Sequence, residues 1–206
     1  MPLFKHIHHN HHSQVFVWEI TESLEELRKG VLLTENSENR INSMHSEIHQ
    51  RGFLSIRQLL KLLNYSDFDL FYTPDGKPHL RDGKRISITH SFEFSAIIIS
   101  DYAVGIDIEM NRTKIQKIAP KFMVDEWAFF DKQNPVEFLT VIWGAKESLY
   151  KIHPDGGLLF KEHLPIEPFY LKDGKTKGWI KKDKFYEIYQ IYFESFKGYT
   201  LVYAGN

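Results

Sequence analysis

Apolar residues recur at helical spacing in the first half of the chain, over a helical region that we expect from about 36 to 63. In its second part they form one stripe, made of Ile48, Phe53, Leu54, Ile56, Leu59, Leu60 and Leu63. Arg51 and Arg57 lie outside this stripe. A shorter helix is expected over 22–29, with Thr21 as its N-cap, because a threonine hydroxyl can accept an N–H group of the first turn.

The second half of the chain contains a comparable helical pattern. Asn134 and Pro135 suit the N-cap and the first helical position of a long helix, which we expect to run to about Ile152, where a segment rich in Pro and Gly stops it. A further helical segment is expected over 114–131, interrupted by Pro120. Each half of the chain is therefore predicted to carry one long helix.

Short apolar runs and alternating segments predict strands around these helices. The strands are expected over 15–20, 68–72, 86–89, 96–100 and 103–109, and an alternating tail over 166–203 is typical of an antiparallel meander. Turns are expected at 73–76, 173–174 and 197–198. We predict an α+β fold of two similar lobes in a pseudo-two-fold arrangement, residues 1–103 and 104–206, each a long helix packed on a mainly antiparallel sheet.

Composition excludes several classes of protein. The 206 residues include 26 Lys and Arg against 27 Asp and Glu, so a globally basic nucleic-acid binder is excluded. There is no cysteine, which excludes disulfide scaffolds, Cys-based metal sites and Cys nucleophiles. No apolar run reaches the roughly 18 residues of a membrane span, and the first residues lack the apolar stretch of a signal peptide, so we expect a cytoplasmic protein.

Five histidines crowd the beginning of the chain: His6, His8, His9, His11 and His12. Such a tract can bind metal. The alternative, which we favour from the sequence, is a solvated tail ahead of the first strand.

The first candidate site is the strand around Asp107 and Glu109. Alternate residues of a strand share a face, so these two carboxylates are expected side by side about 7 Å apart, opposite Val104, Ile106 and Ile108. Like charges at this distance repel, and a hard divalent cation such as Mg²⁺ would neutralise them. An ordinary strand with acidic residues facing solvent is the alternative.

The second candidate site is the segment from Trp143 to Lys151 in the long helix of the second half. Glu147 and Lys151 stand one turn apart, and their plain interpretation is a surface salt bridge. Lys146 falls inside the apolar arc, so it must extend to solvent or meet an anion. Gly144 costs about 1 kcal/mol relative to Ala in a helix, which suggests that another group approaches the backbone there.

The third candidate site is the end of the strand at Thr89, His90 and Ser91. Hydroxyl and imidazole groups suit phosphate oxygens, and His can also act as an acid or a base, although a histidine at a strand end is more often structural. No Gly-x-Ser-x-Gly element and no P-loop are present, which argues against a serine hydrolase and a P-loop NTPase.

Together these motifs resemble the 4′-phosphopantetheinyl transferase superfamily, in its two-lobed Sfp type. The resemblance rests on five segments in order, of which the last two are the most specific: Phe53 to Leu60, Gly76-Lys77-Pro78, Ile88 to Ser91, Val104-Gly105-Ile106-Asp107-Ile108-Glu109 and Trp143 to Lys151. The sequence departs from the family at Thr89, where Ser is common, and at 153–157, where a Gly-Lys-Gly-type loop is common. The loop at 153–157 is expected near the place where the carrier protein docks, so the second departure affects which carrier is preferred rather than the chemistry.

The resemblance implies an enzyme of the holo-[acyl-carrier-protein] synthase class. It would transfer the 4′-phosphopantetheine of coenzyme A to a serine of an apo acyl or peptidyl carrier protein and release 3′,5′-ADP. Carried over by position, Asp107, Glu109 and Glu147 would hold Mg²⁺, and Glu147 and Lys151 would be catalytic. The residues implied for coenzyme A are Arg51, Arg57, Lys77, Thr89, His90, Ser91, Lys146 and Lys151.

The resemblance also implies partners. We expect an acidic helical carrier protein and coenzyme A, no nucleic acid or membrane partner, and a monomer. Lys117, Lys121, Phe122 and Met123 are candidates for carrier docking, and an ordinary amphipathic helix is the alternative for this segment. The alternatives are a non-catalytic homologue that binds coenzyme A or a carrier, and another Mg²⁺-dependent phosphoryl-transfer or hydrolytic enzyme.

Overall fold

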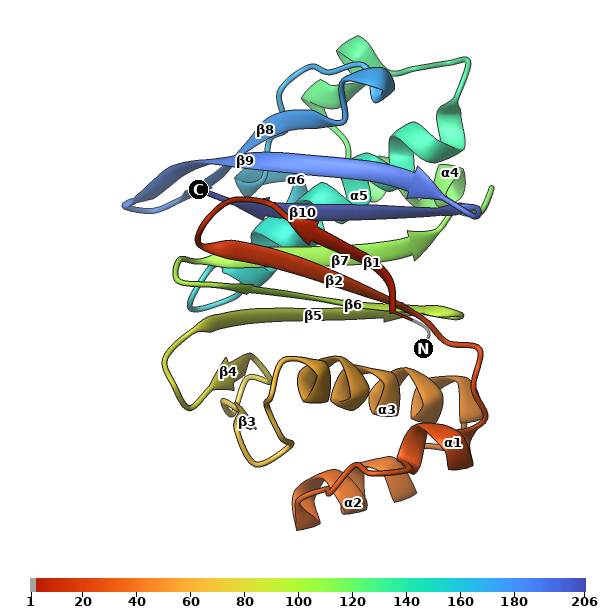
Figure 1. Ribbon diagram of the computed structural model, residues 1–206. Helices are drawn as coiled ribbons and strands as arrows, with labels where there is room; N and C mark the ends of the chain where they lie inside the picture. The colour runs from red at the N-terminus through yellow and green to blue at the C-terminus, as the bar shows by residue number, and fades with distance from the viewer. Residues whose placement is uncertain (1–2) are drawn as a thin grey trace. The chain divides into compact units, whose positions relative to one another are not determined.

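The computed structural model describes residues 3–206, which form two compact units, the first ending at Tyr102 and the second covering Ala103–Asn206 (Figure 1). The first unit contains β1 (Leu3–His8), β2 (Ser13–Glu19), α1 (Leu24–Arg28), α2 (Glu35–Asn42), α3 (Glu47–Leu62), β3 (Leu70–Tyr72), β4 (Pro78–Leu80), β5 (Arg85–Ser91) and β6 (Phe94–Ser100). The second contains β7 (Val104–Met110), α4 (Ile115–Ile118), η1 (Ala119–Lys121), η2 (Asp125–Phe129), α5 (Pro135–Ile152), α6 (Phe160–His163), η3 (Leu171–Asp173), β8 (Lys175–Lys182), β9 (Phe185–Phe196) and β10 (Tyr199–Gly205). The predicted α+β class is confirmed.

The two units share a core topology. In the first, the four-stranded antiparallel sheet has the order β1-β2-β6-β5, and in the second the order is β7-β10-β9-β8. In both, the last strand of the unit lies between an early strand and the penultimate strand. Each unit therefore repeats one three-stranded arrangement, and each adds one edge strand of its own, β1 or β8.

A long helix covers one face of each sheet (Figure 1). In the first unit α3 packs on Phe16, Ile97 and Ile99 through the predicted apolar stripe, including Leu54 and Leu59, which are fully buried. Ile48 departs from this stripe, because it remains exposed in the first turn. In the second unit α5 buries residues such as Phe138, Ile142 and Leu149 against the sheet.

The helix ends differ from the prediction at α1. Ser23, not Thr21, is the N-cap, and it forms a capping box in which its hydroxyl accepts from the Glu26 N–H while Glu26 accepts from the Ser23 N–H. Asn134 is the N-cap residue of α5 and Pro135 its first residue, as expected, but the Asn134 side chain donates to Asp131 rather than capping the helix. The expected region 36–63 is two helices, α2 and α3, separated by residues 43–46.

Three other expectations are corrected. Residues 3–8 form strand β1, paired antiparallel with β2, so the prediction of a solvated tail is wrong for these residues. The segment 114–131 is α4 followed by two 3₁₀ turns rather than a longer helix. The meander begins at Lys175, because residues before it are joined to β8 only by an isolated bridge between Ile166 and Gly178. Among the residues described, no helix is both long and apolar enough to cross a membrane.

Candidate active site

Helix α5 lies very close to the sheet of its own unit because two glycines leave room for it. A Cβ atom on Gly105 of β7 would stand 1.9 Å from the backbone carbonyl oxygen of Ser148 in α5. A Cβ atom on Gly144 of α5 would stand 2.7 Å from Cγ2 of Val202 in β10. The expected close approach at Gly144 is confirmed, and the approaching group is the Val202 side chain. Gly105 has the tighter contact, although the sequence alone gave no sign of its role.

This close packing sets Asp107 against the helix. The buried Asp107 pairs with Val202 across the β7–β10 ladder. Its Oδ1 atom lies 2.9 Å from the Nζ atom of Lys151, which also donates to the Ile106 carbonyl oxygen at 2.7 Å. Lys151 therefore forms an ion pair that joins α5 to β7.

Glu147 lies one turn before Lys151 on α5 and is half-buried. The pKa of its carboxyl is raised from the ordinary 4.5 to about 7, mainly by burial and also by the negative charges of Asp107 and Glu109, while Lys151 opposes this rise. A carboxylate whose ionisation is opposed by two other carboxylates is stabilised by an added cation. The three acidic residues predicted from the sequence therefore act on one another electrostatically.

These carboxylates have the donor chemistry of a hard cation site, because Mg²⁺ prefers oxygen ligands and keeps several waters. Within residues 3–206, no three acidic or histidine side chains already converge as a metal cluster. One oxygen of Asp107 is engaged by Lys151. The residues therefore fit Mg²⁺ by chemistry and by charge, and binding would require their side chains to turn toward the ion.

Lys146 points away from this acidic group. Its side chain is fully buried, with Nζ 2.7 Å from Oε1 of Glu126 and donating to the carbonyl oxygens of Phe122 (2.7 Å) and Phe160 (3.0 Å). Glu126 in turn accepts from the backbone N–H groups of Val124 and Ile166. Of the two alternatives predicted for Lys146, solvent or an anion, the structure shows an anion, which is a carboxylate of the protein. The pair ties η2 and the segment after α6 to α5.

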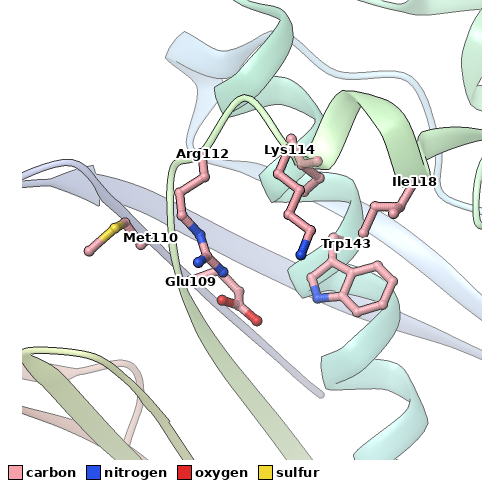
Figure 2. Close-up of a pocket in the computed structure, with 7 residues that line it drawn as sticks. Glu109, Met110, Arg112, Lys114, Ile118 and Trp143 are labelled. Atoms are coloured by element: carbon pink, nitrogen blue, oxygen red, sulfur yellow. The ribbon is translucent and has the colours of Figure 1, made fainter. Parts of the chain in front are cut away.

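A cavity of about 200 Å³ lies beside Glu109, lined by Glu109, Met110, Arg112, Lys114, Ile115, Ile118 and Trp143. In Figure 2 the Arg112 side chain extends toward Glu109, and that of Lys114 ends beside the Trp143 ring. The cavity thus combines an apolar wall with two cations next to the acidic group. Sequence reasoning did not single out Arg112 and Lys114, although both follow Glu109 within five residues.

In the first unit, the end of β5 presents the third candidate group. Thr89 and Ser91 are buried and His90 is exposed. The His90 ring lies over α3, where a Cβ atom on Gly52 would come within 3.1 Å of it, and its centroid is 6.2 Å from that of His49. Gly52 therefore seats the His90 imidazole on the helix.

The two arginines of α3 have different surroundings. The half-buried Arg51 donates from Nη2 to the Ile20 carbonyl oxygen at 3.0 Å, and its buried Nε makes no hydrogen bond with the residues described. Arg57 is buried, its Nε donates to Asp67 Oδ1 at 2.9 Å, and its guanidinium stands 3.5 Å from the centroid of Phe53. Lys77 is half-buried in the turn after β3, where its N–H donates to Thr73 Oγ1.

The candidate docking residues separate into two pairs. Lys117 and Lys121 are exposed. Phe122 and Met123 are each only 1% exposed, so the prediction that they present an apolar docking surface is wrong. Val124 and Trp127, which follow them, are 46% and 44% exposed.

The fold and these charged groups define an α+β protein whose second unit places cationic side chains next to a group of carboxylates. The family model of the 4′-phosphopantetheinyl transferase superfamily matches residues 103–203. The chain is 31% identical over 156 residues to the 4′-phosphopantetheinyl transferase gsp of Aneurinibacillus migulanus, a match that covers 72% of this chain and 64% of that protein. The chain belongs to the 4′-phosphopantetheinyl transferase superfamily.

Proposed function

We propose that this protein transfers the 4′-phosphopantetheine group of coenzyme A to a serine hydroxyl of an apo carrier protein. The observation that carries the proposal is the junction of α5 and β7. There Lys151 pairs with Asp107, and the negative charges of Asp107 and Glu109 raise the pKa of Glu147. These are the residues of the two most specific sequence motifs, and they lie in the region that matches the family model. The match to a relative named as a 4′-phosphopantetheinyl transferase supports the same reaction.

In this reaction the serine oxygen of the carrier forms a bond to the phosphorus that bears pantetheine. The bond from that phosphorus to the bridging oxygen breaks, and 3′,5′-ADP leaves with the electron pair. The serine proton passes to Glu147 or, through water, to solvent, because a carboxylate with a raised pKa is an effective base near neutral pH. Lys151 would hold a pyrophosphate oxygen.

Asp107, Glu109 and Glu147 would hold the magnesium ion. Bound there, it would neutralise the charge that develops on the leaving and bridging oxygens. A carboxylate bound to a metal is a poor base, so the two roles of Glu147 compete, and a water molecule would then accept the proton. The role of Asp107 also changes, because its ion pair with Lys151 must open if both residues are to contact ligand.

For coenzyme A phosphates we propose Arg51, Lys77, Thr89, His90 and Ser91 as contacts. Arg51 is favoured by its buried Nε, which makes no hydrogen bond with the residues described. Arg57 and Lys146 are left out of this set because each is neutralised in a buried ion pair, with Asp67 and Glu126 respectively. For the acidic carrier, Lys117 and Lys121 beside Val124 and Trp127 offer basic and apolar surface.

The test is transfer from coenzyme A to a panel of apo carriers with Mg²⁺, followed as the mass added to the carrier. Loss of a general base costs about 10²- to 10⁴-fold, so Glu147→Gln should lower kcat/KM by at least about 100-fold. Asp107→Asn should do the same. Glu137→Gln is the matched control, because Glu137 lies on the same helix and accepts from Ser195, a bond that the amide oxygen can keep.

Full activity of Glu147→Gln would refute the assigned site. Coenzyme A binding without transfer to any carrier would instead identify a non-catalytic homologue. Steady coenzyme A hydrolysis without a carrier would identify another phosphoryl-transfer enzyme.

A further inference from the structure

Two of the crowded histidines stand side by side on strand β1. His6 and His8 are two residues apart, so their side chains project from the same face of the strand. Both are exposed, and their ring centroids are 4.0 Å apart with the planes tilted by 46°. Among the residues described, β1 is an edge strand of its sheet and pairs with β2 alone.

The His6 ring is held in place from two directions. It stacks on Phe16, its partner across the β1–β2 ladder, with centroids 4.2 Å apart and planes 18° from parallel. Its Nε2 atom lies 2.9 Å from Oε1 of Gln14, the residue that pairs with His8. When Nε2–H donates to this amide oxygen, Nδ1 carries the lone pair.

This is the arrangement that metal-binding histidines use. A histidine ligand binds metal through one ring nitrogen while the other donates to an oxygen acceptor, which fixes the tautomer and the ring orientation. Imidazole–metal bonds of about 2.0–2.1 Å require two ligating nitrogens about 3 Å apart. With centroids 4.0 Å apart, the two rings are close enough for one nitrogen of each to bind the same ion.

We propose that His6 and His8 form a two-imidazole site for a first-row divalent cation. Imidazole nitrogen favours Zn²⁺, Ni²⁺ and Cu²⁺ over Mg²⁺, and Cu²⁺ binds most tightly in this series. In the part of the chain that the structure describes, no third acidic or histidine side chain completes the group, so water fills the other coordination positions. The proposal rests on residues of the first unit alone and does not depend on the proposed transferase reaction.

The site is also distinct from a flexible histidine tract. His9, His11 and His12 follow the strand, and His12 is engaged by Asp101, whose Oδ2 lies 3.0 Å from His12 Nδ1. The strand pair has a fixed spacing, whereas His11 is an exposed residue of the bend between β1 and β2. This difference supplies a matched control.

The experiment is a Cu²⁺ titration of the full chain by calorimetry, with nitrogen superhyperfine structure in the electron paramagnetic resonance spectrum reporting the number of imidazole ligands. Loss of an outer-sphere partner costs about 10- to 100-fold in affinity, and loss of a ligand at least as much, so His6→Ala and His8→Ala should each weaken the tightest site about tenfold or more. Gln14→Leu should weaken it about tenfold through the His6 ring. His11→Ala and the distant His45→Ala should leave it unchanged.

His8→Ala and Gln14→Leu keep the stacking of His6 on Phe16, so they test the site even if His6→Ala disturbs the sheet. Far-ultraviolet circular dichroism would verify that each variant is folded. Equal loss in His11→Ala would overturn the proposal in favour of the flexible tract. A tightest site unaffected by His8→Ala, or one with a single nitrogen ligand, would also overturn it.

Discussion

The long helices α3 and α5 each bury one cation, and the two cations differ in their place on the helix: Arg57 of α3 lies outside the predicted apolar stripe, whereas Lys146 of α5 lies inside its apolar arc. Arg57 of α3 pairs with Asp67, donates also to Phe53 O and Ser37 Oγ, and lies over the Phe53 ring. Lys146 of α5 is fully buried against Glu126. In both helices the counterion comes from a segment outside the helix, so a charged residue within or beside the apolar face of a helix can indicate a buried ion pair as readily as a ligand contact.

The largest expected effect comes from removing either counterion. Asp67→Asn and Glu126→Gln each leave a buried cation without its charge partner, which costs about 3–5 kcal/mol of unfolding free energy near pH 7. The control Glu162→Gln changes an exposed carboxylate and should cost less than about 0.5 kcal/mol. Urea unfolding measures all three.

Alkaline pH should separate the two ion pairs. Burial lowers the pKa of Lys146. Between its folded and unfolded pKa values the folded protein binds fewer protons than the unfolded one, so stability rises with pH in that window. Arg57 cannot lose its proton. Part of the unfolding free energy that Glu126→Gln loses should therefore be recovered at pH 10, whereas Asp67→Asn should recover none. Equal recovery in the two variants would contradict the neutralisation of Lys146.

A smaller effect on stability is expected at the glycine that allows close packing on each helix, Gly105 of β7 beside α5 and Gly52 within α3. In Gly105→Ala the new methyl would collide with the Ser148 backbone, which cannot move aside, so we expect a loss of about 3 kcal/mol. In Gly52→Ala the neighbour is the His90 side chain at 3.1 Å, which can rotate, and the helix gains about 1 kcal/mol of propensity. Its stability should change little, while the His90 position shifts.

The same denaturation experiment checks this pair of variants. A Gly105→Ala protein as stable as the parent would contradict the close approach of α5 to β7.

The smallest effect is the pH dependence of stability that comes from Glu147, in the acidic group of the second unit. In the metal-free protein the pKa of Glu147 is about 7 against an ordinary 4.5, so the folded state binds more protons between these values. The contribution of Glu147 is most favourable below pH 4.5 and is lost as the pH rises to about 7. We expect a loss of about 2 kcal/mol, because solvent screens a half-buried group.

The loss is measured as the difference in unfolding free energy between the parent and Glu147→Gln from pH 4.5 to 8. The variant should lack this decline and become the more stable protein at pH 8. Parallel pH profiles of the two proteins would contradict the raised pKa.

Sequence periodicity predicted the long helices and the α+β class. A helix buries one face only if its apolar residues recur every three to four positions, and a half-buried strand only if they alternate. It failed for the segment 114–131, where Pro120 and a series of bulky residues form short turns held by Lys146 and Glu126. It also missed β1, because polar histidines occupy the exposed positions of this half-buried edge strand and no apolar run marks it.

The sequence by itself determined the family, through motifs whose order and residue types are specific, and it identified Asp107, Glu109, Glu147 and Lys151 as a group. Only the tertiary structure decided how each charge is used. Lys151 pairs with Asp107, Lys146 with Glu126 and Arg57 with Asp67, and each of these partners is ten or more residues away along the chain. The physical reason is that the energy of a charge depends on its burial and on its neighbours in space, which local spacing does not specify.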